Sequence, residues 1–443
     1  MTLFSQKSGD NKWPLAICIA GFILSVIAYY PGFMSPDSFD QYTQATTNHY
    51  GDWHPPIMAA VWRVLNKVYK GPLMMMLLQQ AMLWCSCYQL LSTFRSFLWR
   101  LLVLLFVLSP FVQNYAGYII KDVQMAFACL LVFAILFRVH FIDARLSVVK
   151  GLLCIILITY AIWLRQNALP AVLPLLYFFS YLLVRNKLHL RLFVFVALTA
   201  GLYSLQFPFN KKIVHAEKEY PEFTIYLQDI TGVYHETGDA YYPASMYAKG
   251  TDTARLRTRY SPITFDTLAY TNNGEEIFAT NEQTIKELRN SWLKCISAHP
   301  FVYLHNRYIG FLYFLRVRNG SPFVYWYPRI DPNPYGFVYH KNVWSDKVLS
   351  YIHSQGGMVY MRPWFWLLLG IVLLGAIPLV KDVFLRFAYV VLVSSSLLYL
   401  LPQFFIFQTD TDFRYVYWNC IAEALAFCLL LIAVFNKKAL VSN

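Results

Sequence analysis

The chain has 443 residues, of which 58% are hydrophobic and 14% are charged. This balance excludes an ordinary soluble domain of this length and indicates a polytopic membrane protein. The formal net charge is +13. Lysine and arginine collect in the short cytoplasmic loops of membrane proteins, next to an anionic leaflet, so the charge is explained without nucleic acid and no nucleic-acid partner is expected.

Apolar runs predict an all-α fold with about ten transmembrane helices, because about 17 to 25 apolar residues cross the roughly 30 Å hydrocarbon core of a bilayer. Every second short connection is basic, which predicts that both termini are cytoplasmic. Segment 299–320 is the ambiguous one, and its embedded His305 and Arg307 favour an interfacial helix over an eleventh span. The ten runs are 14–33, 72–93, 101–119, 123–139, 151–164, 168–184, 192–207, 363–380, 387–405 and 415–435.

Three parts follow from this topology. Residues 1–207 form an N-terminal transmembrane module that carries an external catalytic loop at 34–71. Residues 208–362 form a large external region, α-rich or mixed, and residues 363–443 form a C-terminal transmembrane module. No duplicated halves are visible, and this disfavours the repeat architecture that is common among secondary transporters.

The first external loop contains the sequence SPDSFDQ, in which Ser35 is expected to cap a short helix that begins at Pro36. Asp37 then lies in the first turn, where the helix dipole favours an ionised carboxylate. Gln41 follows one turn later on the same face, and Asp40 lies one residue away from it. A purely structural role for Asp37, as a capping residue, stays open at this point.

The same loop continues as DWHPP, where two prolines prevent helix at the preceding residue and begin a new helix. His54 is therefore expected in extended backbone, immediately before a helix whose start faces Asp37. A histidine beside prolines can also be an ordinary turn residue. Sharing a loop with two aspartates makes it a candidate site residue.

Two further external turns interrupt apolar sequence. Lys121 and Asp122 do so between the third and fourth runs, and they would bring an ammonium and a second carboxylate to the same surface. Arg165 and Asn167 do so in RQNA, where the planar fork of the guanidinium suits a phosphate. The turn with Lys121 and Asp122 could also be a simple solvated hairpin, and Arg165 could also be an ordinary loop arginine. Both structural interpretations stay open at this point.

The last external turn contains DFRYVYW, in which Arg414 precedes the final apolar run and its aromatic collar. Glu423 lies two turns inside that run and is either a buried structural acid or a functional one.

Short external connections thus carry acids, an imidazole and single cations above an apolar bundle. A phosphate attached to a membrane-soluble chain fits that combination, because cations hold the phosphate while a carboxylate activates a hydroxyl.

These motifs carry a resemblance to a known group. PGFMSPDSFDQ, WHPP, KDVQMAF, RQNA and DFRYVYW, in this order and on one side of the membrane, resemble the GT-C fold glycosyltransferases that take sugars from polyprenyl-phosphate donors. Within that fold they are similar to bacterial serotype-converting O-antigen glucosyltransferases. The resemblance covers most of residues 14–210 and the last span.

The resemblance implies roles for individual residues. Asp37 is the implied general base, with Asp40 as the substitute, and Asp122 is implied to orient the acceptor. Many relatives have a longer acidic cluster where this chain has SPDSFDQ, so no cofactor is expected and a divalent metal is not favoured. The implied substrate-binding residues are His54, Lys121, Arg165, Asn167, Gln41 and Arg414.

The implied function is inverting transfer of a sugar, expected to be glucose, from undecaprenyl phosphate to a periplasmic O-antigen or lipopolysaccharide acceptor. The implied location is the bacterial inner membrane, with the active site on the periplasmic face and the lipid bilayer as a further partner. Two alternatives remain: a lipid-linked sugar flippase or transporter, and an O-antigen polymerase or ligase. The second alternative requires arginines in the large external region, which contains Arg255, Arg257, Arg259, Arg307, Arg316 and Arg318.

Overall fold

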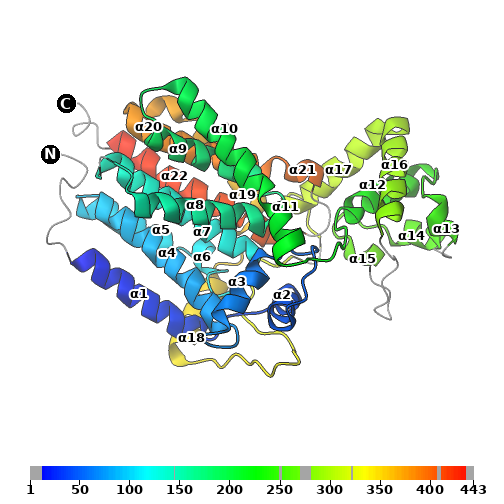
Figure 1. Ribbon diagram of the computed structural model, residues 1–443, viewed down its shortest axis with the longest axis horizontal. Helices are drawn as coiled ribbons and strands as arrows, with labels where there is room; N and C mark the ends of the chain where they lie inside the picture. The colour runs from blue at the N-terminus through cyan, green and yellow to red at the C-terminus, as the bar shows by residue number, and fades with distance from the viewer. Residues whose placement is uncertain are drawn as a thin grey trace.

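The computed structural model describes residues 12–143, 145–248, 252–269, 281–320, 323–406 and 411–435. Within these ranges the regular secondary structure is helical, and the only β-type pairings are three isolated bridges. A long bundle of apolar helices forms the main body, and a smaller helical lobe projects beyond one end of it (Figure 1). The all-α fold class is therefore confirmed.

Long apolar helices form the bundle. Four segments are long and apolar enough to cross a membrane, and five further apolar helices have 10–17 residues. These features fit a helical membrane protein, while ten crossings stay a prediction. Nine of the predicted runs match a bundle helix to within about five residues at each end. The run 101–119 does not: α5 ends at Val107, because Ser109 is extended and Pro110 begins the separate short helix α6. The bundle helices are α1 (Trp13–Tyr29), α4 (Leu73–Thr93), α5 (Phe97–Val107), α7 (Lys121–Phe141), α8 (Val148–Leu164), α9 (Leu169–Leu183), α10 (Leu188–Ser204), α19 (Pro363–Gly375), α20 (Val383–Leu400) and α22 (Tyr417–Phe435).

Helix α7 is the central element of the bundle. It packs against α4, α8, α9 and α22, and every residue from Asp122 to Val139 is buried. A helix that is surrounded on all sides is apolar around its whole circumference, which explains the unbroken hydrophobic sequence. The consequence for function is that Lys121, the first residue of α7, is fixed at one end of the bundle.

The first and the last described helices, α1 and α22, have their outer ends at the same end of the bundle. The start of α1 and the end of α22 both lie at the end farthest from the lobe (Figure 1). Consecutive bundle helices are joined by short connections, so the basic connections, such as those at 95–100 and 185–191, lie at this same end. The polar turns that contain Lys121, Arg165 and Arg414 lie at the opposite end.

The lobe has its own apolar core. Leu227, Ile230, Leu288 and Cys295 are among its buried residues. The lobe contains α12 (Phe223–Thr237), α13 (Ala244–Ala248), α14 (Thr253–Arg259), α15 (Asp266–Ala269), α16 (Glu282–Ala298) and α17 (Pro300–Phe314).

Helix α17 belongs to the ambiguous segment 299–320. The Arg307 guanidinium of α17 is 2.5 Å from the Asp229 carboxylate of α12, and both side chains are almost fully buried. Trp292 Nε1 donates to the same Asp229 oxygen at 2.8 Å. The embedded arginine is thus explained by an ion pair inside the lobe.

The remainder of the predicted 208–362 region packs on the bundle. We refer to the extended segment 323–342 as the strap. The Tyr339 hydroxyl donates to the Ala28 carbonyl at 3.1 Å, and Asn342 Nδ2 donates to the Ile27 carbonyl at 2.9 Å. Region 208–362 therefore contains two parts with different cores. The remaining elements are α2 (Pro36–Thr47), α3 (Ile57–Leu65), α6 (Pro110–Gln113), α11 (Gln206–Pro208), η1 (Phe209–Ile213), α18 (Val343–Ser354), η2 (Val359–Met361), η3 (Ile377–Leu379), α21 (Gln403–Ile406) and η4 (Phe413–Val416).

Candidate active site

A cavity of about 740 Å³ lies where the bundle meets the lobe. Its bundle side is lined by polar residues that come from four separate turns of the chain. Its lobe side is lined by residues at the start of α12 and around the start of α15. The predicted site residues that line it are Asp37, His54, Lys121, Arg165, Asn167 and Arg414.

The start of α2 is held by backbone pairing on two sides. The Phe33 amide donates to the Gly117 carbonyl at 2.8 Å, and the Met34 amide donates to the Arg329 carbonyl at 3.1 Å. The Ser35 amide then donates to Ser38 Oγ at 3.2 Å, an interaction of a capping box. Asp37 therefore lies in the first helical turn, and this sequence prediction is confirmed.

Asp37 is bound by a cation at the cavity wall. Arg414 Nη1 donates to Asp37 Oδ2 at 2.6 Å, and His54 Nε2 lies 3.8 Å from Asp37 Oδ1. Burial is the largest single influence and by itself would raise the pKa of the Asp37 carboxyl, but the charge of Arg414, together with the Arg414 hydrogen bond and the other neighbouring groups, outweighs it and holds that pKa below its ordinary value. Asp37 is therefore an ionised carboxylate, and 32% of its side-chain surface is exposed.

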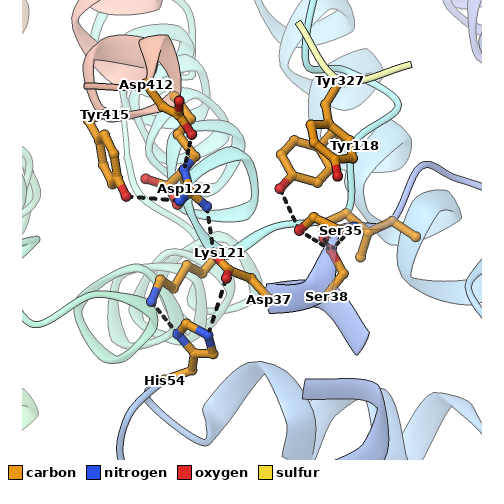
Figure 2. Close-up of polar contacts among 12 residues, drawn as sticks. Ser35, Asp37, Ser38, His54, Tyr118, Lys121, Asp122, Tyr327, Asp412 and Tyr415 are labelled. Atoms are coloured by element: carbon orange, nitrogen blue, oxygen red, sulfur yellow. Dashed lines mark hydrogen bonds and ion pairs between the residues drawn. The ribbon is translucent and has the colours of Figure 1, made fainter. Parts of the chain in front are cut away.

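His54 connects Lys121 to Asp37, as Figure 2 shows. Burial and the charge of Arg165 lower the pKa of Lys121 to about 7, and in its protonated form Lys121 donates to His54 Nδ1 at 2.7 Å. Because an ammonium can only donate, Nδ1 accepts, and the imidazole carries its proton on Nε2 toward Asp37. Burial lowers the pKa of His54, and the charge of Lys121 lowers it further, to about 3. The predicted approach of His54 to Asp37 is thus observed, with a neutral imidazole.

Arg414 is held by three groups at once. Besides Asp37, its Nε lies 3.2 Å from Asp412 Oδ2, and its Nη2 donates to the Tyr415 hydroxyl at 2.9 Å. The guanidinium also lies over the Tyr415 ring, 4.8 Å from the centroid. This arrangement fixes the planar fork of Arg414 at the cavity wall.

Arg165 and Asp122 form a buried ion pair behind the cavity. The Arg165 guanidinium donates to Asp122 through Nη1 and to Asn167 Oδ1 through Nε, the latter at 3.0 Å. Asp122 is only 1% exposed and does not line the cavity. The expectation that Asp122 is as available as Lys121 is therefore wrong. Helix α7 begins at Lys121, and its second residue turns toward the end of α8 instead of toward the surface.

Asp40 and Gln41 lie outside the cavity lining. Asp40 accepts from Gln44 Nε2 at 2.8 Å, whereas Gln41 is 1% exposed. Gln41, which shares a face of α2 with Asp37, is thus buried, and Asp40 pairs with Gln44, so neither of these two predicted site residues lines the cavity. Asp37 is the carboxylate of α2 that lines the cavity.

Several residues that line the cavity are not among the site residues predicted from the sequence. The rings of Tyr118 and Tyr327 stack with centroids 4.7 Å apart, and the Tyr118 hydroxyl donates to Ser35 Oγ at 2.6 Å (Figure 2). Trp53 precedes His54 in the recognised GDWHPP motif, so its position was available as a clue. Glu222 and Asp266 lie in the lobe, far from the motifs in sequence, and no local pattern marks them.

The site combines an ionised carboxylate with three cations. Arg414 and Arg165 are each paired with carboxylates. Among the described residues, the Lys121 ammonium has no carboxylate within ion-pair distance and contacts His54 instead. No group of three or more His, Cys, Asp or Glu side chains in the described ranges is arranged to hold a metal ion. Such a wall can bind an anion next to a proton acceptor.

Comparison with known proteins identified no relative of this chain. No protein-family model matches the chain, and searches of curated proteins and of solved structures gave no significant match. The functional interpretation therefore depends on the geometry of the cavity and on the motifs in the sequence.

Proposed function

We propose that this protein is an inverting glycosyltransferase that moves a sugar, expected to be glucose, from undecaprenyl phosphate to a glycan acceptor. The observation that carries the proposal is the cavity wall on which the ionised Asp37 lies next to Arg414, His54 and Lys121. A phosphate leaving group needs cations, and a hydroxyl nucleophile needs a base. The wall supplies both at the end of an apolar bundle that suits a lipid-linked donor.

The reaction is a single displacement. Asp37 takes the proton of an acceptor hydroxyl, and the hydroxyl oxygen forms a bond to the anomeric carbon of the donor sugar. The bond from that carbon to the phosphate oxygen breaks, and the electron pair leaves with the lipid phosphate. The configuration at the anomeric carbon is inverted. Because phosphate is already a good leaving group, the protein contributes mainly positioning and charge neutralisation.

The charges indicate where the phosphate binds. Arg165 and Arg414 are already balanced by carboxylates, whereas Lys121 is not balanced by one in the described part of the chain. Because the Lys121 side chain makes no ion pair with a described carboxylate, its protonated amine is the cation best placed to donate to a phosphodiester oxygen. A lipid diphosphate carries more negative charge and would need further cations. We therefore assign the donor phosphate to Lys121, flanked by the two arginines.

Asp37 is both the proposed general base and the ion-pair partner of Arg414. A carboxylate that is paired with Arg414 is a weaker base than a free one, because the ion pair favours the ionised form. When a phosphate takes over part of the Arg414 fork, Asp37 becomes more basic. Donor binding would thus prepare the base for the acceptor. Asp122 would act indirectly, by holding Arg165 in place.

The location in the proposal follows from the two ends of the bundle. The basic short connections, the start of α1 and the end of α22 lie at one end, and the cavity lies at the other. By the positive-inside rule the basic end is cytoplasmic. The cavity then opens on the periplasmic side of a bacterial inner membrane, where O-antigen and lipopolysaccharide acceptors are found.

The alternatives have weaker support. A transporter would be expected to hold ionisable groups deep in the bundle, and Glu423 is such a group, but its Oε1 accepts from Ser396 Oγ within the core at 2.5 Å. A polymerase or ligase would use arginines of the external region, and none of the six named arginines lines the cavity. Arg307, for example, is buried in its pair with Asp229.

The proposal is tested with the full chain reconstituted in lipid nanodiscs. Radiolabelled undecaprenyl-phosphate glucose with a β linkage is supplied together with an unglucosylated lipopolysaccharide. We expect labelled lipopolysaccharide whose new linkage is α by nuclear magnetic resonance. Absence of transfer, combined with acceptor-independent movement of the lipid-linked sugar across proteoliposomes, would replace the proposal with a transporter.

A further inference from the structure

The two sides of the cavity differ in their charged residues. The bundle side carries three cations, Lys121, Arg165 and Arg414, together with the carboxylates of Asp37 and Asp412. The lobe side carries two acids, Glu222 and Asp266, and no lysine or arginine of the described lobe residues lines the cavity. A cavity with this polarity is suited to hold two different groups, an anion against one wall and an uncharged polar group against the other.

An indole ring lies at the junction of the two walls. The Trp53 amide donates to Glu219 Oε2 at 2.8 Å, and the Glu219 amide donates to Asp52 Oδ1 at 2.6 Å. The Glu217 amide donates to the Tyr50 carbonyl at 2.8 Å, so the linker that leads into the lobe is fastened to the first external loop. Trp53 nevertheless keeps 37% of its surface exposed. Its backbone is fixed while its ring lines the cavity.

We infer that Trp53, Glu222 and Asp266 form the acceptor subsite and that this subsite selects a neutral, hydroxyl-rich sugar over an anionic one. The inference rests on the proposed function, because it places the acceptor on the wall that the donor phosphate leaves open. A carboxylate accepts hydrogen bonds from adjacent sugar hydroxyls through both oxygens. An indole ring offers a broad apolar face for the C–H face of a pyranose, while its N–H is polar.

The same wall discriminates by charge. A uronic acid or phosphate group on the acceptor would lie near Glu222 and Asp266, inside a cavity where solvent screening is reduced. Juxtaposed like charges oppose binding and are a common source of specificity. The acceptor predicted by this wall is therefore a glycan segment without a negative charge next to the reacting hydroxyl.

The test measures sugar binding directly, without requiring turnover. The full chain in nanodiscs is titrated with cellobiose and with the same disaccharide oxidised to its uronic acid, using saturation-transfer nuclear magnetic resonance. We expect the neutral sugar to bind about tenfold more tightly than the acidic one, as like-charge repulsion predicts. Trp53→Ala should weaken cellobiose binding, and Trp53→Phe should restore part of it. The double variant Glu222→Gln, Asp266→Asn should remove most of the discrimination.

The control is Glu236→Gln, which removes an acid from the exposed part of the same helix, α12, without touching the cavity lining. It should keep the full discrimination. Equal binding of the two sugars by the unaltered chain, or discrimination that survives in the double variant, would overturn the inference. The predicted binding pattern without any glucosyl transfer would instead count against the proposed function and leave the subsite standing.

Discussion

Arg414 binds Asp37 at 2.6 Å although the two residues are 377 positions apart in the chain. The last external turn thus closes over the first one, and the proposed base is paired with a proposed phosphate ligand. Asp412 and Tyr415 hold the same guanidinium from other directions. This relationship couples the state of the base to the position of Arg414.

Replacing Arg414 with glutamine should change the pH dependence of transfer. Arg414 lowers the pKa of Asp37, so its loss raises that pKa, and the acid limb of the pH–rate profile should move to higher pH. The Michaelis constant for the donor should rise as well, because one phosphate ligand is lost. Arg95→Gln, at an exposed position between α4 and α5 and outside the cavity lining, is the matched control. An acid limb at the same pH in Arg414→Gln and in the unaltered chain would contradict the coupling.

Lys121→Met tests the assignment of the phosphate. Because Lys121 is not balanced by a described carboxylate, its loss should raise the Michaelis constant for the donor about tenfold or more, in line with a charge-assisted hydrogen bond of roughly 1.5–3 kcal/mol. The Michaelis constant for the acceptor should change little. Lys347→Met, at an exposed position of α18, serves as the control. A selective effect on the acceptor would move the phosphate elsewhere in the cavity.

His54 should make stability depend on pH below neutrality. Its pKa is lowered to about 3 in the folded chain and is about 6.5 in an unfolded one. Its contribution is therefore present above pH 6.5 and decreases as the pH falls toward 3, by up to about 1.4 kcal/mol per pH unit. Asp37 has a lowered pKa, so its contribution is fully present above its unfolded pKa of about 3.9 and is lost only below that value.

The measurement is the apparent melting temperature of the purified chain between pH 7.5 and pH 5 at intervals of about half a unit, a window above the unfolded pKa of aspartate. The advantage of the unaltered chain over His54→Gln should stay nearly constant from pH 7.5 down to about 6.5, the unfolded pKa of histidine, and should shrink as the pH falls below it. His189→Gln, at an exposed position of α10, should track the unaltered chain. A difference between the unaltered chain and His54→Gln that stays constant below about pH 6.5 as well would show that His54 does not stay neutral in the fold.

Breaking the buried ion pair of the lobe should destabilise the lobe selectively. Asp229→Asn leaves the Arg307 charge buried without its partner, and such changes typically cost about 3–5 kcal/mol. Limited proteolysis should cut the lobe faster and leave the bundle intact. Asp239→Asn, where 61% of the side chain is exposed, should have no comparable effect. Unchanged proteolysis of the lobe in Asp229→Asn would show that the pair adds little stability.

The sequence predicted best those features that depend on residues close together in the chain. The position of Asp37 followed from Ser35 and Pro36, because capping preferences operate over a few residues. Most bundle helices followed from apolar length, although the break between α5 and α6 after Val107 did not. His54 next to Asp37 was also accessible, since the prolines fix the direction in which α3 begins.

Other features depend on contacts between distant segments. Asp122 seemed exposed because it interrupts an apolar stretch, yet its partner Arg165 lies on another helix, and the pair is buried. The division of 208–362 was equally hidden, because aromatic residues on the strap and in the lobe look alike in sequence while they pack on different cores. Glu222 reaches the cavity through the placement of the whole lobe.

The most direct test of the central claim compares Asp37→Asn with Asp40→Asn in the nanodisc transfer assay, together with the affinity for undecaprenyl-phosphate glucose. In Asp37→Asn, transfer should fall by about 10²–10⁴, the usual contribution of a general base, while donor affinity is kept or increased because Arg414 is released for the phosphate. Asp40→Asn, which alters a carboxylate outside the cavity lining, should retain transfer. Full transfer by Asp37→Asn would contradict the account.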